Sequence, residues 1–262
     1  MLSYQHSYHA GNLADVHKHA LLAAMLDYLT RKPKALSYIE THAGRGLYRL
    51  DSAEAAKTGE ARAGIERLAS RFAPDHPYSR ALGLIRKEHG AQAYPGSPLL
   101  AATLLRRFDR MYLADLHPQE FAALEALMRP RHALCRQEDG LAFALSVTPP
   151  DPRRGLMLID PSYEVKAEYT ALPERIAAIH RRWNVGVIAL WYPILTSAAH
   201  RPMLDALRAM AMPKTLIHEV RFAPAREGHG MVGSGMAVIN APFGLQDEAD
   251  RLSALFAPLA KK

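Results

Sequence analysis

The hydrophobic positions of this chain follow two alternating periods. Short apolar runs typical of buried strands are separated by segments in which apolar residues recur every three to four positions, as on one helix face. We predict seven strands, at residues 36–41, 110–115, 132–136, 155–160, 185–191, 215–222 and 236–240. This alternation favours an α/β fold, a mostly parallel sheet with helices on both faces.

Helices are predicted between these runs. Asn12 can cap a helix whose apolar positions continue to Thr30. Further helices are predicted over residues 98–108, 118–128, 140–147 and 247–259. Ser97 would cap the first of these. The runs 215–222 and 236–240 are close enough in sequence to pair as a hairpin at the edge of the sheet.

Residues 51–92 break this pattern. They are rich in Ala, Arg and Glu, show helical periodicity around 65–72 and 78–89, and contain no strand-like run. We therefore interpret the chain as one domain, residues 1–262, with residues 51–92 inserted as a small helical subdomain.

Composition narrows the class of protein. A hydrophobic content of 49% excludes a disordered binder. The one cysteine, Cys135, excludes an internal disulfide and a cysteine-based zinc site. The chain opens without a signal-peptide pattern, and its apolar runs are much shorter than a membrane span. We therefore expect a cytoplasmic protein without a membrane partner.

The formal net charge is +7 and the sequence pI is about 9.5. Such charge favours a polyanionic partner, because each neutralised phosphate releases condensed counterions, although many basic proteins bind nothing anionic. Three adjacent pairs stand out among the arginines: Arg106-Arg107, Arg153-Arg154 and Arg181-Arg182. Each pair could equally be a solvated helix or strand end, and the sequence does not place the three on a common face.

The strongest chemical signal is an apolar strand that ends in Asp160-Pro161-Ser162-Tyr163. The exocyclic amine of a base is a poor nucleophile, because its lone pair is delocalised into the ring. The Asp160 carboxylate and the Pro161 carbonyl could accept its two hydrogens and turn the lone pair toward a methyl donor, while Tyr163 stacks on the base. The structural alternative is a strand-to-loop turn with a core tyrosine.

Acids and glycines follow the other predicted strands. The segment from Tyr38 to Gly46 has the shape of a nucleotide-binding turn but lacks the full G-x-G-x-x-G, which disfavours a pyrophosphate cofactor. S-adenosylmethionine has no phosphate and needs carboxylates for its ribose and amino groups. Asp115 is placed for the ribose hydroxyls and Asp139-Gly140 for the adenine edge. A helix N-cap is the alternative for each acid and would alone account for Asp139.

The N-terminal segment is rich in histidine. His17 and His19 are two positions apart and diverge on a helix, so a metal site is disfavoured. We favour a polar tail that becomes ordered on a substrate; the alternative is an unstructured terminus.

Eight motifs carry a family resemblance: Met1 to His19, Thr41 to Gly44, Tyr94 to Leu99, Leu116 to Pro118, Asp139-Gly140, Arg153 to Leu156, Ala189 to Pro193, and Gly235-Met236. Their sequences and order closely resemble the RlmJ family of 23S ribosomal RNA (adenine-N6)-methyltransferases. The resemblance runs from residue 1 to at least Pro242.

This resemblance implies a Rossmann-like class I methyltransferase that uses S-adenosyl-L-methionine, releases S-adenosyl-L-homocysteine and needs no metal. It implies N6 methylation of an adenosine in 23S ribosomal RNA, either free or early in assembly. Asp160 would be the catalytic acceptor, and Tyr4, Pro161 and Tyr163 would meet the substrate. The implied cofactor contacts are His19, His42, Ser97, Asp115, Asp139, Gly140 and Asp160.

Two positions depart from the family pattern. Ser162 stands where the second proline of Asp-Pro-Pro-Tyr is usual, which loosens the turn, and Asp115 replaces a glutamate, which shortens its reach. Three alternatives stay open: methylation of DNA adenine N6, methylation of a protein glutamine amide at N5, and RNA binding without catalysis. The interpretation requires Asp160 to lie in the pocket at the strand ends and not in a purely structural ion pair.

Overall fold

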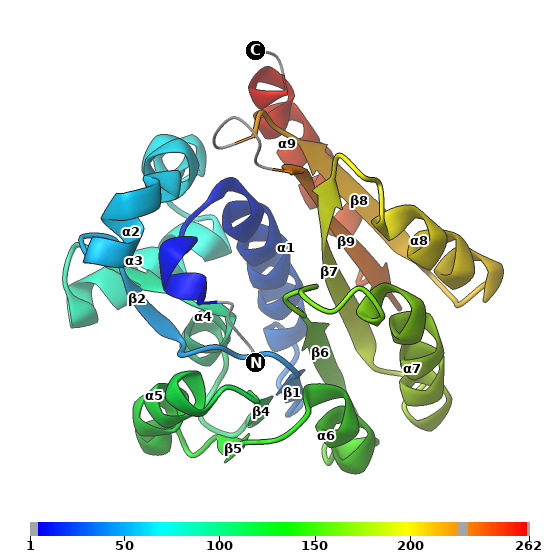
Figure 1. The fold of residues 1–262 in the computed structure, drawn as a ribbon. Coiled ribbons are helices and arrows are strands. Elements are labelled where there is room, and N and C mark those ends of the chain that lie inside the picture. The colour runs from blue at the N-terminus through cyan, green and yellow to red at the C-terminus, as the bar shows by residue number, and fades with distance from the viewer. Residues whose placement is uncertain (1–4, 225–229, 261–262) are drawn as a thin grey trace.

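The computed structural model describes residues 5–224 and 230–260 and has a seven-stranded sheet at its centre (Figure 1). The strand order is β5-β4-β1-β6-β7-β9-β8. The strands are β1 (Ser37–Glu40), β4 (Arg110–Ala114), β5 (Leu134–Arg136), β6 (Gly155–Ile159), β7 (Val187–Leu195), β8 (Leu216–Arg221) and β9 (Met231–Ile239). The first five are parallel, and β9 runs antiparallel between β7 and β8. The predicted mostly parallel sheet and the predicted hairpin are confirmed.

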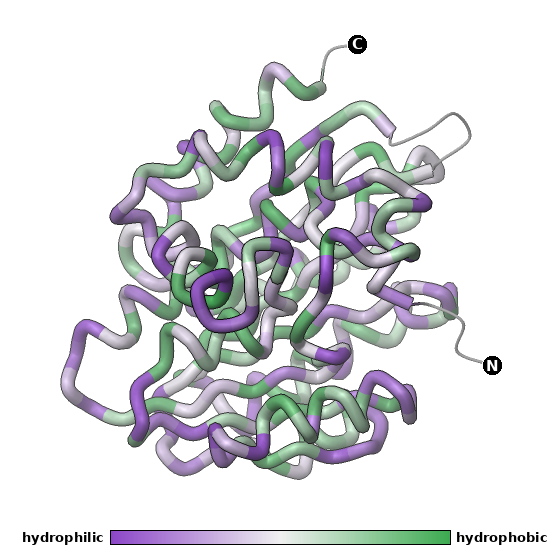
Figure 2. The backbone as a smooth tube through the Cα atoms, turned by 90° about the vertical axis from the view of Figure 1, so that its left-hand side faces the viewer, coloured by the Kyte–Doolittle hydropathy of each residue, from purple (hydrophilic) through white to green (hydrophobic). Residues whose placement is uncertain are grey.

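Helices cover both faces of the sheet. One group packs around α1 and the other around α7. The first comprises α1 (Leu13–Thr30), α4 (Ser97–Leu104), α5 (Pro118–Met128) and α9 (Leu245–Phe256), and the second α6 (Gly140–Val147), α7 (Glu168–Arg182) and α8 (His200–Ala209). Successive residues of β6 point to opposite faces, so Leu156 and Leu158 enter the first core and Met157 and Ile159 the second. Green and purple stretches alternate along the tube in Figure 2, as expected of elements that each bury one face.

Short elements fill the chain between β1 and α4. These are β2 (Leu47–Arg49), α2 (Ala53–Thr58), a π-helical turn (Arg62–Glu66), a 3-10 turn (Ala69–Arg71), α3 (Pro77–His89) and β3 (Ala93–Pro95). β2 and β3 pair as a separate two-stranded sheet, which the sequence did not predict. The π-helical turn packs on the start of α1, where a Cβ added at Gly64 would lie 2.1 Å from the Gly11 carbonyl oxygen. Only glycine allows this close approach.

The predicted helix starts are partly confirmed. The Asn12 side chain accepts a hydrogen bond from the Asp15 N–H at 2.8 Å and caps α1 as expected. The expected cap at Ser97 is wrong, because Gly96 occupies the N-cap position and Ser97 is already helical. Helices α7 and α8 were not predicted. Within the described residues, the structure contains no helix with the length and apolar character of a membrane span.

Candidate active site

A cavity of about 370 Å³ opens at the carboxyl ends of β1, β4, β5 and β6. The residues that follow these strands line it together with residues of α1 and the segment before it. Nine predicted site residues lie on its wall: His19, His42, Ser97, Asp115, Asp139, Gly140, Asp160, Pro161 and Tyr163. The tenth, Tyr4, is outside the described residues. The residues predicted from the strand ends and those implied by the family resemblance therefore share one location, whereas the role of each residue stays a prediction.

Asp160 lies in this cavity and forms an ion pair there. Its Oδ2 accepts a hydrogen bond from Lys18 Nζ of α1 at 2.6 Å, and Lys18 also lies 3.1 Å from Asp15 Oδ1. Among the described residues no hydrogen bond reaches Oδ1 of Asp160, which leaves an acceptor beside the cavity. Lys18 was not predicted as a site residue, because it is 142 positions from its partner and lies in a helix predicted from a cap and apolar spacing.

Lys18 is a buried cation held by two acids. Burial alone would lower the pKa of its ammonium, but the carboxylates of Asp160 and Asp15 outweigh burial and raise the pKa above its usual range. Burial also disfavours the charged form of Asp15, yet His6 and Lys18 hold the pKa of this carboxyl well below its usual value. Lys18, Asp15 and Asp160 therefore compensate one another's charge. Substitution of any one of them by a neutral residue would leave a buried charge without its full compensation.

The turn after β6 positions Pro161 and Tyr163. Tyr163 has a φ of 57°, a left-handed conformation that costs a non-glycine residue roughly 1–3 kcal/mol. Its hydroxyl donates to the Trp191 carbonyl at 2.8 Å, and its ring lies 4.4 Å from that of Tyr169. Only 9% of Tyr163 is exposed, which leaves little ring surface for a base to stack on in this conformation.

Asp115 joins the turns after β1 and β4. Its Oδ2 accepts from the Gly44 N–H at 2.7 Å and its Oδ1 from the His117 N–H at 2.8 Å. Burial raises the pKa of this carboxyl despite these bonds. Each carboxylate oxygen keeps a second lone pair, so Asp115 can accept further hydrogen bonds from a ligand.

Asp139 and Gly140 both have structural roles. The Asp139 side chain accepts from the Ala142 N–H at 2.7 Å and caps α6, so the N-cap alternative is realised. A Cβ at Gly140 would lie 1.8 Å from the Thr41 carbonyl oxygen, so α6 can approach the turn after β1 only through a glycine. These roles place backbone atoms at the cavity wall, and they do not exclude contact with a ligand.

One acid is buried behind the cavity wall and bonds two hydroxyl groups. Glu40, the last residue of β1, accepts hydrogen bonds from Tyr38 at 2.8 Å and from Ser97. Complete burial raises the pKa of Glu40 to about 8 despite these bonds. Ser97 thus does not cap its helix but uses its hydroxyl to connect the cavity wall to β1.

Both predicted histidines have a lowered pKa, which favours the uncharged imidazole. Burial lowers the pKa of His19 to about 3 and lowers that of His42 as well. His19 Nδ1 is 3.0 Å from the Tyr94 hydroxyl, while its buried Nε2 has no hydrogen-bond partner among the described residues. This nitrogen can therefore take a hydrogen bond from a ligand group or from a water molecule.

The histidine-rich segment packs on the residues between β2 and α3. His6 Nε2 is 2.9 Å from Asp15 Oδ2, and His9 Nδ1 is 3.0 Å from Glu60 Oε1. Both histidines line the cavity. In the described ranges, no cluster of three or more His, Cys, Asp or Glu side chains could hold a metal ion.

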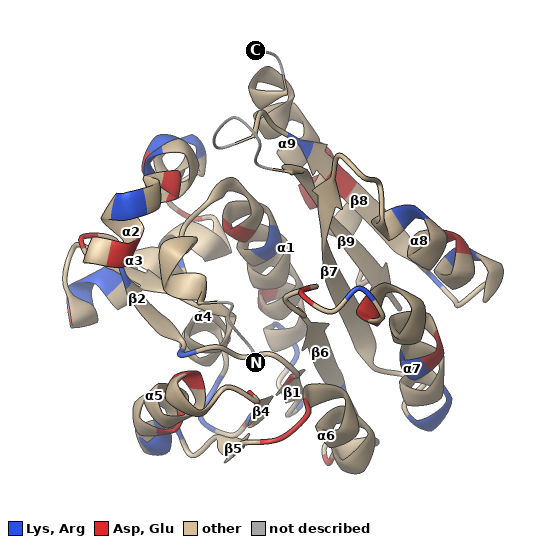
Figure 3. Cartoon of the chain, viewed as in Figure 1, with Lys and Arg blue, Asp and Glu red and all other residues tan. Residues whose placement is uncertain are grey.

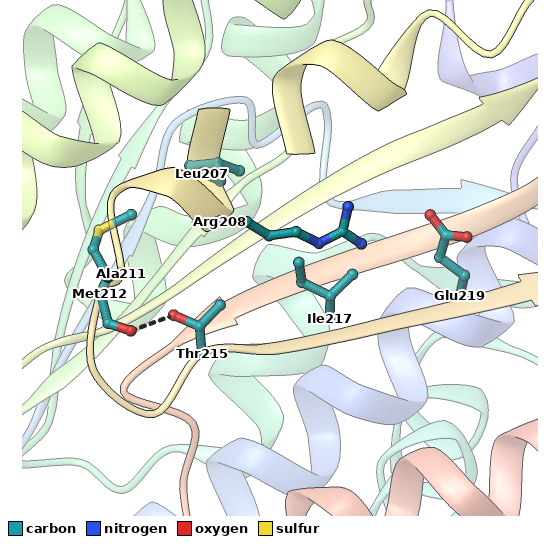
Figure 4. A pocket seen from close by; sticks show the side chains of 7 residues that line it. All are labelled: Leu207, Arg208, Ala211, Met212, Thr215, Ile217 and Glu219. Carbon is teal, nitrogen blue, oxygen red and sulfur yellow. Dashed lines mark hydrogen bonds between the residues drawn. The ribbon is translucent and has the colours of Figure 1, made fainter. Parts of the chain in front are cut away.

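A second, more open cavity of about 540 Å³ lies between α8 and β8 (Figure 4). Arg208 and Glu219 are its charged residues. None of the predicted site residues lines it, and it shares no residue with the first cavity.

Comparisons with known proteins show the family of this chain. A family model described as "Ribosomal RNA large subunit methyltransferase D, RlmJ" matches residues 33–260. The chain is 38% identical to ribosomal RNA large subunit methyltransferase J of Escherichia coli K12, over 96% of this chain and 91% of that protein. It is also 38% identical to the protein of the same name from Haemophilus influenzae, over 95% and 90%.

A solved structure shares the fold. Protein LPL1258 from Legionella pneumophila has a TM-score of 0.85 and 33% identity, and the match covers 96% of this chain and 94% of that one. The strand order, with one antiparallel strand inserted next to the last, is that of a Rossmann-like class I methyltransferase, as predicted. The chain belongs to the RlmJ family of ribosomal RNA large subunit methyltransferases.

Proposed function

We propose that this chain transfers a methyl group from S-adenosyl-L-methionine to the N6 amine of an adenosine in 23S ribosomal RNA. The observation that carries the proposal is that Asp160 and Pro161 directly follow β6 and line the same cavity as Asp115 and Asp139. Open α/β sheets bind nucleotide-like ligands at this edge. The family and the names of its ribosomal RNA methyltransferase relatives support the RNA substrate.

The residues of the cavity fit S-adenosyl-L-methionine. Asp115 would accept the ribose hydroxyls, Asp139 and Gly140 would hold the adenine edge, and His42, Ser97 and Asp160 would complete the contacts. The unpartnered Nε2 of His19 supports a polar ligand group at that point. When bound, the cofactor supplies an electrophilic methyl group on a sulfonium and leaves as S-adenosyl-L-homocysteine.

Asp160 and Pro161 would act on the target amine. Oδ1 of Asp160 and the Pro161 carbonyl oxygen would each accept one N–H of the adenine, which pyramidalises the nitrogen and directs its lone pair to the methyl group. Lys18 holds the other carboxylate oxygen and keeps the acceptor oriented. After transfer, the surplus proton leaves the nitrogen to Asp160 or to water.

The RNA must present the adenosine out of its stack, which favours free or early-assembly RNA as the substrate. Tyr163 would then contact the base, and Tyr4 would meet the RNA. We also propose that residues 51–92 are an inserted subdomain that supports the segment before α1. Glu60 supports this role, since its carboxylate bonds both His9 and, at 3.1 Å, Asn12.

Transfer of tritium from labelled cofactor tests the proposal. Purified protein should label 23S ribosomal RNA and not DNA or protein, and Asp160→Asn should abolish labelling while it keeps the fold. If Asp160 serves only in a structural ion pair, Asp160→Asn would keep its turnover even though its melting temperature falls. Label found on DNA or on a glutamine amide would move the assignment to one of the two enzymatic alternatives.

Three further variants separate the roles within the site. Lys18→Met should lower kcat by about 100-fold, and Lys18→Arg should restore part of it if orientation of Asp160 is the role. Tyr4→Ala should lower turnover on RNA far more than cofactor affinity. Equal losses of turnover and cofactor affinity in Tyr4→Ala would contradict a substrate-facing tail.

A further inference from the structure

The three arginine pairs lie along one edge of the sheet. Each pair belongs to a segment at the start of a parallel strand: residues 105–110, which include the first residue of β4, residues 148–154 before β6, and residues 180–186 before β7. Residues 31–36 precede β1 in the same way. Because these four strands are parallel neighbours in the order β4-β1-β6-β7, the segments lie side by side. We call these four segments the basic edge.

Hydrogen bonds connect the segments of the basic edge. The guanidinium groups of Arg106 and Arg154 both donate to the Lys34 carbonyl, at 2.9 and 3.1 Å. The Trp183 indole donates to the Arg153 carbonyl. These bonds hold neighbouring segments of the basic edge together, although the segments come from distant parts of the chain.

The basic edge holds the excess charge of the protein. It carries ten of the 33 Lys and Arg residues but only two of the 26 Asp and Glu residues. The other residues therefore hold 23 cations and 24 acids and are close to neutral. Figure 3 shows part of this excess as a blue segment at the carboxyl end of α7.

Most of these cations face solvent without an acidic partner. Within the described residues, ion pairs of the basic edge are limited to Arg106 with Asp109, at 2.9 Å, and Arg31 with Asp27, at 3.0 Å. The exposed cations outside these pairs are Lys32, Lys34, Arg107, Arg110, Arg153, Arg181 and Arg182. Self-repulsion on such a surface is relieved when it meets a polyanion.

An aromatic ring lies among these cations. Phe108 is 55% exposed, and the Arg106 guanidinium packs 4.5 Å from its ring centroid. A ring held this way offers a flat face on which an unpaired base can stack. Cations with an interleaved aromatic ring are typical of surfaces that bind nucleic acid strands.

We propose that the basic edge is a second RNA-binding surface, which holds phosphates of the substrate RNA remote from the target adenosine. This inference rests on the proposed function. The five residues of β6 separate the basic edge from the cavity by about 17 Å at ~3.3 Å per residue. RNA bound at both places must therefore extend well beyond one nucleotide, so a long transcript uses the basic edge and a short oligonucleotide uses only the cavity.

The test removes three charges from the basic edge, in Arg107→Gln/Arg153→Gln/Arg181→Gln. The matched control removes three exposed charges elsewhere, in Lys87→Gln/Arg175→Gln/Arg201→Gln. Affinity for a long 23S ribosomal RNA transcript is measured against salt. We expect the edge variant to bind at least about tenfold more weakly and its log–log salt slope to fall by about 2, with much smaller changes in the control. Affinity for a short oligonucleotide and for the cofactor should be unchanged.

Two outcomes would overturn the inference. The edge variant could match the control in affinity and slope, or the edge substitutions could abolish binding to phosphatidylglycerol vesicles while RNA binding is unaffected. Tritium transfer by the unmodified protein tests the proposed function independently of RNA binding at the basic edge. Loss of RNA binding in the edge variant supports the basic edge even where the unmodified protein fails to methylate RNA. Methyl transfer with normal RNA binding by the edge variant supports only the proposed function.

Discussion

Charged side chains differ in burial and pairing between the two ends of the parallel strands. At the carboxyl ends, charged and polar side chains are buried and compensated within the chain, as Lys18 is by Asp15 and Asp160. At the amino ends, cations such as Arg107 and Arg153 are exposed and lack acidic partners among the described residues. An unpaired buried charge is costly, so Lys18, Asp15 and Asp160 compensate one another within the chain and can serve to orient a small ligand. Most described cations of the exposed edge are not paired in this way and remain available to bind a polyanion.

The largest effect should follow from removing the charge of Asp160. Asp160→Asn should lower kcat by about 10³-fold or more and should change cofactor affinity much less. The single amide oxygen would pair with Lys18 Nζ, so the amide NH2, a donor, would face the target amine in place of the acceptor Oδ1. Asp205→Asn, on the exposed surface of α8, is the control and should leave both unchanged. Single-turnover kinetics would contradict the role of Asp160 if the variant kept a tenth of the normal rate.

Gly140 tests the close packing at the cavity end. Gly140→Ala should lower the free energy of unfolding by about 3 kcal/mol and weaken cofactor binding, because the new methyl group overlaps the Thr41 carbonyl. Gly83 has open space around it, so Gly83→Ala in α3 should raise the free energy of unfolding by up to ~1 kcal/mol. Urea titrations in which both variants lost equal stability would show that this packing is not limiting.

Phe108 tests the opposite edge. Phe108→Ala should weaken binding of the long RNA transcript by about tenfold, the equivalent of one stacked base, with an unchanged melting temperature. Phe243 is 85% exposed and lies outside the basic edge, so Phe243→Ala should leave RNA affinity unchanged. Fluorescence anisotropy that gave equal affinities for the two variants would remove Phe108 from the proposed surface.

Glu40 should make the stability of the cavity end depend on pH. Burial raises the pKa of Glu40 to about 8, so the folded state keeps a proton that the unfolded chain releases near pH 4.5. The contribution of Glu40 to stability is thus complete at lower pH and declines as pH rises from about 4.5 to 8. Glu40→Gln should flatten this decline in melting temperatures taken across that window, and an unaltered profile would contradict the assignment.

Much of the fold was predictable from local signals. Asn12 followed by apolar helical spacing predicts α1, and the uninterrupted apolar run of β6 predicts a strand buried on both faces. The helix α7 was missed because it contains Pro173, which normally interrupts a helix. The two-stranded sheet was missed because its strands have only three residues each, too few to show a period.

The location of the site was predictable, but the state of its side chains was not. Parallel strands end at one edge, so acids after successive strands must gather there, as Asp115, Asp139 and Asp160 do. The contact between Lys18 and Asp160 depends on how α1 packs across the sheet, which no local pattern encodes. The inward ring of Tyr163 likewise depends on its tertiary partner Trp191.

Mapping of N6-methyladenosine in 23S ribosomal RNA tests the central claim most directly. RNA from cells that lack this protein would be treated with the unmodified protein or with Asp160→Asn, together with the cofactor. We predict that one adenosine gains an N6-methyl group with the unmodified protein and stays unmodified with the variant. An RNA that gains no methyl group from the unmodified protein, or gains it equally from both, would contradict the claim that Asp160 and the Pro161 carbonyl hold an adenine amine for methylation.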